Sequence, residues 1–135
     1  MSIASGSGSV MKEFDFMAIK VTPKASTAIT KGEVLVNPNG NGWEPSFSGA
    51  HGPFMVALED VASAASPSDV SMLRRGVVKL TAQADTTEGQ FVKPGSNSGE
   101  VTPLSTFGTA DLKGIVGSAL EDVDATECGK FLIGY

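Results

Sequence analysis

Short apolar segments alternate with polar turns along most of this chain. The turns are rich in glycine, asparagine, serine and proline, which accept or impose the backbone angles of tight turns. Strands spaced by about 8–12 residues with turn signals between them favour a sandwich or a small barrel. The pattern predicts an all-β domain with strands within 13–21, 33–36, 54–58, 72–81, 90–93, 100–104, 114–120 and 130–135.

Individual segments refine this picture. The run from Asn37 to Gly42 alternates asparagine with glycine and proline and predicts a hairpin tip, with Trp43 directly after it. Phe54–Leu58 is continuously apolar, which indicates a strand buried on both faces. Segment 13–21 mixes apolar and charged residues, which predicts a strand with one buried face, and Gly76 predicts a bulge in the strand that contains it.

One pentapeptide occurs twice. Ala57–Val61 reads Ala-Leu-Glu-Asp-Val, and Ala119–Val123 reads the same. Upstream, Thr30–Pro38 parallels Thr87–Pro94, and each is followed by a glycine- and asparagine- or serine-rich turn. We interpret the chain as two copies of one small unit, about 27–81 and 86–135, which share a core in a pseudo-symmetric barrel or sandwich.

The N-terminal segment, residues 1–12, has a different composition. Serine, glycine and alanine dominate it, and such a segment cannot bury enough apolar surface to offset its ordering entropy. We expect a flexible arm in front of a single domain at 13–135. On a partner surface the arm could become ordered through Ile3, Val10 and Met11; the alternative is a solvated tail that never orders.

Composition excludes several classes of function. The chain of 135 residues has a net charge of −5 with scattered lysine and arginine, which disfavours nucleic acid as a partner. A single cysteine excludes an intrachain disulfide and a cysteine-based zinc site. The sequence has neither a signal peptide pattern nor an apolar run of about 20 residues, so we expect synthesis in the cytoplasm and no membrane partner.

The sequence offers little catalytic chemistry. His51 lies in a Gly-Pro corner without a partner at a known spacing, and Cys128 is a lone thiol. The acidic pairs at 59–60 and 121–122 could together bind a cation or perform acid–base chemistry, although acids after a buried strand are ordinary turn residues. We predict no cofactor, no metal site and no enzymatic activity.

The order of elements resembles that of the small capsid cement, or head decoration, proteins of tailed phages. The resemblance covers about Thr27–Tyr135, and a phrase of the type Gly-x-Val/Ala-Gly-x-Ala-Leu-Glu is present at Gly114–Glu121. The first copy departs from it, because Gly52–Leu58 has proline and phenylalanine where the second copy has glycines. The resemblance implies a structural virion protein that binds the outer face of an assembled head through the major capsid protein, commonly as a homotrimer.

Exposed aromatic residues on loops are the candidate contacts for such a role. Trp43, Phe47 and Phe107 are the apolar candidates on loops, for the shell or for neighbouring protomers, although each could equally fold back on its own domain. A second hypothesis is a carbohydrate- or receptor-binding module of a virion fibre, with Trp43 and Phe47 as its platform. A third is a small barrel enzyme that uses the acidic turns.

Overall fold

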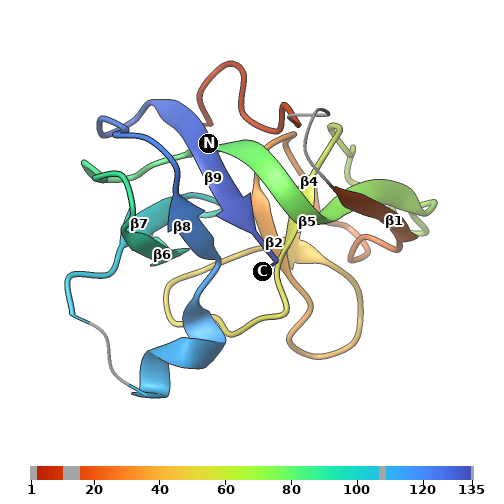
Figure 1. Cartoon of the computed structure of the whole chain (residues 1–135). Coiled ribbons are helices and arrows are strands. Elements are labelled where there is room, and N and C mark those ends of the chain that lie inside the picture. The colour runs from red at the N-terminus through yellow and green to blue at the C-terminus, as the bar shows by residue number, and fades with distance from the viewer. Residues whose placement is uncertain (1–2, 11–15, 107–108, 135) are drawn as a thin grey trace.

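The computed structural model describes residues 3–10, 16–106 and 109–134, and its elements are strands of 2 to 12 residues and one 3₁₀ helix (Figure 1). The elements are β1 (Met17–Val21), β2 (Val34–Val36), β3 (Glu44–Pro45), β4 (Met55–Ala57), β5 (Val70–Thr81), β6 (Phe91–Pro94), β7 (Val101–Pro103), η1 (Thr109–Gly114), β8 (Gly117–Ala119) and β9 (Cys128–Ile133).

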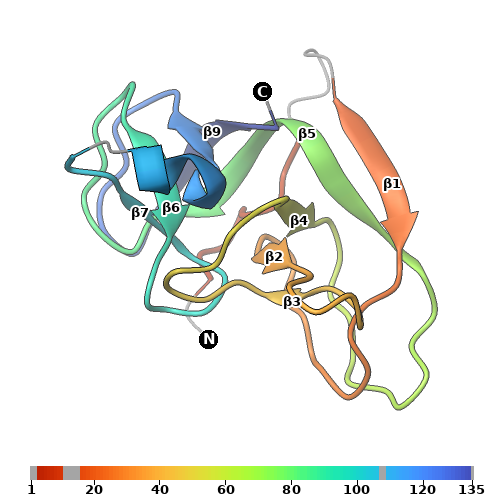
Figure 2. The same cartoon turned by 90° about the horizontal axis from the view of Figure 1, so that it is seen from below.

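The strands form one sheet in the order β3-β2-β4-β5-β9-β8-β6-β7, and β1 pairs with β5 outside this path. The pairings between these strands are antiparallel. The sheet curls into a half-barrel, in which β5 crosses the middle of the molecule between two groups of strands (Figures 1 and 2). The all-β prediction is confirmed, with a single curled sheet as its form.

Strand β5 connects the two groups because it is long and changes partners along its length. Its first half pairs with β1 on one side and β4 on the other, and its second half pairs with β9. Gly76 lies at the change with φ 146°, and the register against β1 shifts at Met17–Ala18, opposite Arg75 and Leu73. The irregularity predicted at Gly76 is therefore present in this part of β5.

Apolar side chains from both groups of strands form the interior. The larger cluster lies across the two groups and includes Val34, Leu73, Leu80 and Phe131, none of which is exposed. A smaller cluster combines residues of β2, β4 and β5 with Ile29 and consists of Ile29, Leu35, Met55, Ala57 and Met72. The three residues of β4 are fully buried, as the continuous apolar run predicts.

The two groups of strands use the same pairing scheme. Ile19 of β1 pairs with Met72 of β5, and Val78 and Phe131, each 59 residues further along the chain, form the corresponding pair of β5 with β9. The same shift relates four consecutive pairs. The match begins in β1, earlier than residue 27. Superposition of the two halves in space stays a prediction.

The repeated pentapeptides have equivalent backbone contacts. The N–H of Gly32 donates to Ala57 O at 2.8 Å, and the N–H of Gly89 donates to Ala119 O at 2.8 Å. At the other end, Val61 pairs with Ile29, and Val123 with Thr86, in isolated bridges.

Strand β1 differs from the prediction of one buried face. Its residues 17–20 are exposed, with Met17 at 44% and Ile19 at 39%, and the preceding Phe16 is 46% exposed. The reason is its place in the fold, because among the described residues β1 pairs with β5 alone and forms an outer strand beside it (Figure 2). The hydrophobic pattern predicts which face of a strand can be buried. Whether that face is buried depends on the neighbouring elements.

Candidate functional site

The exposed loop between β3 and β4 lines two hollows on the surface of the described chain. It carries Phe47, which is 45% exposed, and ends in the cis peptide Gly52–Pro53. The loop is held at both ends, because Ser46 N–H donates to Val34 O at 2.8 Å and Gly52 N–H to Lys113 O at 2.7 Å. On one side it lines a hollow of about 380 Å³ together with Asn37 and Pro38.

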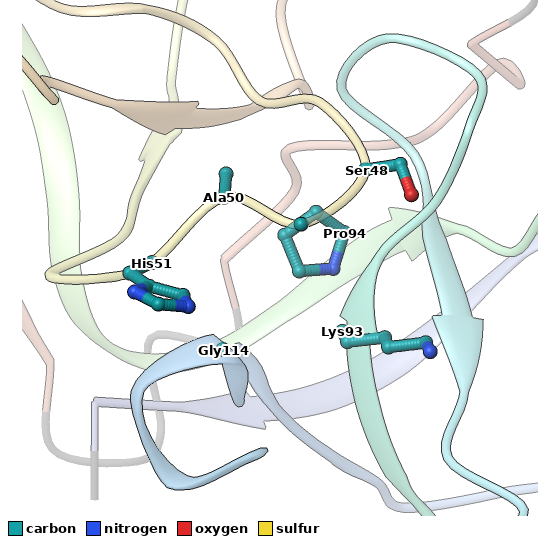
Figure 3. Close-up of a pocket in the computed structure, with 7 residues that line it drawn as sticks. Ser48, Ala50, His51, Lys93, Pro94 and Gly114 are labelled. Carbon is teal, nitrogen blue, oxygen red and sulfur yellow. The ribbon is translucent and has the colours of Figure 1, made fainter. Parts of the chain in front are cut away.

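Residues of the same loop also line a smaller hollow of about 190 Å³ (Figure 3). His51 and Ser48 come from the loop, Lys93 comes from β6, and Gly114 comes from the end of η1. The hollow thus combines one cationic side chain, one imidazole and one hydroxyl. The Lys93 side chain extends away from His51 (Figure 3), so these groups do not converge on one point, and the set lacks a nucleophile paired with a base.

The predicted contact residues lie in different parts of the molecule. Phe47 is exposed on its loop, whereas Trp43 is half-buried against the smaller core cluster. Trp43 is also fixed by its backbone, since its N–H donates to Thr22 O and its C=O accepts from Lys24 N. A half-buried indole offers little platform for a sugar ring. Phe107 and Met11 lie outside the described residues.

The N-terminal segment lies against the domain over residues 3–10, and the flexibility that its composition predicts stays a prediction. Gly8 N–H donates to Lys79 O at 2.7 Å, and Lys79 N–H donates to Ser9 O at 3.1 Å. Val10 forms a bridge with Val78 and packs on the larger core cluster, and Ile3 is half-buried. Backbone pairing with an open strand edge stabilises a segment whose side chains are too small to do so.

Side-chain hydrogen bonds add to this packing. Ser7 is 4% exposed, and its hydroxyl and that of Thr81 are 2.8 Å apart. Ala4 N–H donates to Thr81 Oγ1 at 2.9 Å, and the Cys128 thiol donates to Ser5 O at 3.2 Å. Cys128 is therefore a contact of the N-terminal segment in this structure.

The acidic turns have structural roles. Asp60 Oδ1 accepts from Lys31 N at 2.8 Å, and Asp122 Oδ1 accepts from Glu88 N at 2.8 Å, so each aspartate holds the turn before the matching strand. Glu121 Oε2 accepts from Lys130 N at 2.9 Å. The described part of the chain contains no group of three or more histidine, cysteine, aspartate or glutamate residues placed to hold a metal ion.

Glu33 is a buried carboxylate that the sequence reasoning missed. Its side chain is fully buried, Oε1 accepts from Thr30 N at 2.5 Å, and Oε2 has no hydrogen-bond partner among the described residues. Burial raises the pKa of Glu33, and the bond from Thr30 lowers the pKa in part. Alignment of the two sequence copies could have indicated this role of Glu33 as an acceptor. Gln90 occupies the matching position, and its side chain accepts from Thr87 N at 2.8 Å.

No described helix is long and apolar enough to cross a membrane. The chain matches no protein-family model and no curated protein. Among solved structures it is similar to the head fiber gp8.5 N base of bacteriophage phi29, with a TM-score of 0.62 and 18% sequence identity over 87% of this chain and 94% of that chain. At this identity the likeness shows a common fold: the chain has the β fold of that head fiber base.

Proposed function

We propose that this chain is a structural protein of a phage head, held on the outer surface of the assembled shell by contacts with the major capsid protein. The observation that carries the proposal is the likeness in fold to the phi29 head fiber base over nearly the full length of both chains. The resemblance of its element order to head decoration proteins points to the same location. Neither argument involves catalysis, in agreement with the structural roles of the acidic turns.

Within this role we propose a cement protein that reinforces the shell as a homotrimer. The exposed loop with Phe47 and the strand β1 leave apolar side chains uncovered, and symmetric assembly on a shell would cover them while multiplying weak contacts.

The test is to add the purified protein to heads assembled without it and to sediment the heads. We expect saturable binding, a bound mass that corresponds to trimers and a higher temperature of DNA release. Heads that leave the protein in the supernatant at micromolar concentration would overturn the proposal.

A second candidate is the base of a head fibre, which the phi29 likeness favours. A base anchors further chain to the shell and need not reinforce it. The two candidates differ in the same experiment, because a base binds heads without changing the temperature at which they release DNA.

A further inference from the structure

The outer edge of β1 has its own backbone hydrogen-bonding groups directed away from the sheet. Ala57 directs both its N–H and its C=O toward the β2 side, and it pairs with Met72 of β5. Ala57 and Met72 are therefore a non-hydrogen-bonded pair, so Met72 directs its N–H and C=O away from β4 and toward Ile19, its partner in β1. Hydrogen-bonded and non-hydrogen-bonded pairs alternate along an antiparallel pair of strands. The next residue, Lys20, therefore directs its N–H and C=O outward.

The matching edge in the other half of the molecule carries a strand-like segment. Lys79 lies 59 residues after Lys20 in the shared pairing scheme. Its outward N–H donates to Ser9 O and its outward C=O accepts from Gly8 N. One site of this kind is thus occupied by the N-terminal segment of the chain, and within the described residues β1 pairs with β5 alone.

Other edges of the sheet are short and contain proline. Strand β3 has two residues and ends at Pro45, and strand β7 has three and ends at Pro103. Short strands and proline are common protections against unwanted pairing. Strand β1 has five residues and contains neither proline nor glycine. The backbone groups on its outer edge can therefore hydrogen-bond to an added strand.

The side chains around this edge indicate the chemistry of a partner. Met17 and Ile19 are exposed and supply an apolar surface. Lys20 lies on β1, and Arg74 and Arg75 line a hollow of about 220 Å³ beside Met17. Three of the ten lysine and arginine residues of an acidic chain are therefore on or beside one short strand. An extended segment with acidic side chains complements this arrangement.

We propose that β1 is the docking strand of the protein: an extended, acidic segment of the shell protein adds to its outer edge at Ala18–Lys20 and covers Met17 and Ile19. The inference rests on the proposed function, because it takes the shell protein as the occupant. The occupied edge at Lys79 supports it, since the same pairing scheme accepts an added segment there.

The experiment compares wild-type protein with Lys20→Pro and Lys20→Ala on heads assembled without the protein. Proline removes the outward N–H of residue 20 and leaves the bonds between β1 and β5, so we expect binding about tenfold weaker or more. Alanine keeps the N–H and should bind within about threefold of wild type. Ile19→Glu, which places a negative charge on the covered surface against an acidic segment, should also weaken binding about tenfold or more.

Hydrogen exchange in wild-type protein gives a readout that does not depend on a variant. The Lys20 amide should exchange fast in the free protein and slowly on heads, while the Lys79 amide, already bonded to Ser9, should be slow in both states. Normal binding by Lys20→Pro, or fast Lys20 exchange on heads, would overturn the docking strand and leave the proposed function standing. Absence of wild-type binding would overturn both.

Discussion

Strand β1 and the second half of β5 have matching places in the pairing scheme, yet one is exposed and the other is buried. Ile19 is 39% exposed, whereas its counterpart Val78 is fully buried. The difference lies in what packs on each side chain, since Val78 belongs to the larger core cluster, against which Val10 also packs, whereas Ile19 belongs to neither cluster of the described residues. Pairing fixes where a strand lies, and a covering segment decides what its side chains contribute to stability.

The same difference extends to polar side chains. Thr22 donates its hydroxyl hydrogen to Asp69 at 2.5 Å, on the exposed surface. Its counterpart Thr81 bonds instead to the N-terminal segment at Ala4 and Ser7. The two equivalent hydroxyl groups thus have different hydrogen-bond partners. Substitutions in both halves can measure what the N-terminal segment contributes to stability.

The largest contrast is expected between Leu80→Ala and Ile19→Ala. Leu80 is fully buried in the larger core cluster, so its truncation should cost about 2–5 kcal/mol of unfolding free energy. Ile19 already contacts solvent, and its truncation should cost less than about 1 kcal/mol. Urea unfolding followed by Trp43 fluorescence measures both. Equal losses would mean that β1 is covered in solution and would remove the contrast between the strands.

The next contrast compares two glycines at matching turns. Gly32 and Gly89 have φ of 91° and 90°, so alanine at either costs about 1–2 kcal/mol of backbone strain. A Cβ at Gly89 meets no atom within 4 Å, whereas a Cβ at Gly32 would lie 2.4 Å from Ser7 Cβ. Gly32→Ala should therefore cost about 1–3 kcal/mol more than Gly89→Ala, because it also displaces the N-terminal segment.

A shortened chain separates the two contributions in the glycine pair. Without residues 1–9, Gly32→Ala and Gly89→Ala should destabilise the domain equally, since only the strain remains. A persistent excess cost at Gly32 in the shortened chain would show that the N-terminal segment is not responsible for it.

The sequence was sufficient to predict most strands and the hairpin turns, because those depend on local pattern. The Asn37–Gly42 turn joins β2 to β3 as expected, and Phe54–Leu58 contains the buried strand β4. Repetition of Ala-Leu-Glu-Asp-Val was also informative, since each copy makes the same backbone bond to a glycine turn. These features require no knowledge of distant neighbours.

Features that depend on distant contacts could not be predicted. Composition marks residues 3–10 as poor in apolar surface and gives no sign of the strand edge at Lys79 that they meet. The exposure of β1 follows from its place beside β5, which pattern alone does not contain. Of the candidate contact residues that the structure describes, Phe47 is exposed, whereas Trp43, Ile3 and Val10 are half-buried, and their roles as contacts stay predictions.

A smaller contrast is expected at the two threonines. Thr81→Val removes the partner of the buried Ser7 hydroxyl and of the Ala4 N–H, which should cost about 1–2 kcal/mol. Thr22→Val removes an exposed bond to Asp69 and should cost less than about 0.5 kcal/mol. Urea unfolding measures the difference, and limited proteolysis should show faster cleavage near residues 3–10 in Thr81→Val alone. Similar proteolysis of both variants would contradict a role for Thr81 in holding the segment.

The last prediction concerns the buried carboxylate of Glu33, which is replaced by the uncharged amide found at the matching position, Gln90. Burial raises the pKa of Glu33 above its usual 4.5, so the folded protein binds a proton more readily than the unfolded chain does. Stability from this group is therefore full below pH 4.5 and decreases as pH rises from there through the folded pKa. Glu33→Gln keeps the acceptor for Thr30 N and removes the charge, as Gln90 does at the matching position. We expect Glu33→Gln to abolish this decrease in stability and to be more stable than wild type at pH 7. Urea unfolding from pH 4 to pH 8 measures both effects. An unchanged dependence of stability on pH would show that Glu33 is hydrated in the folded protein.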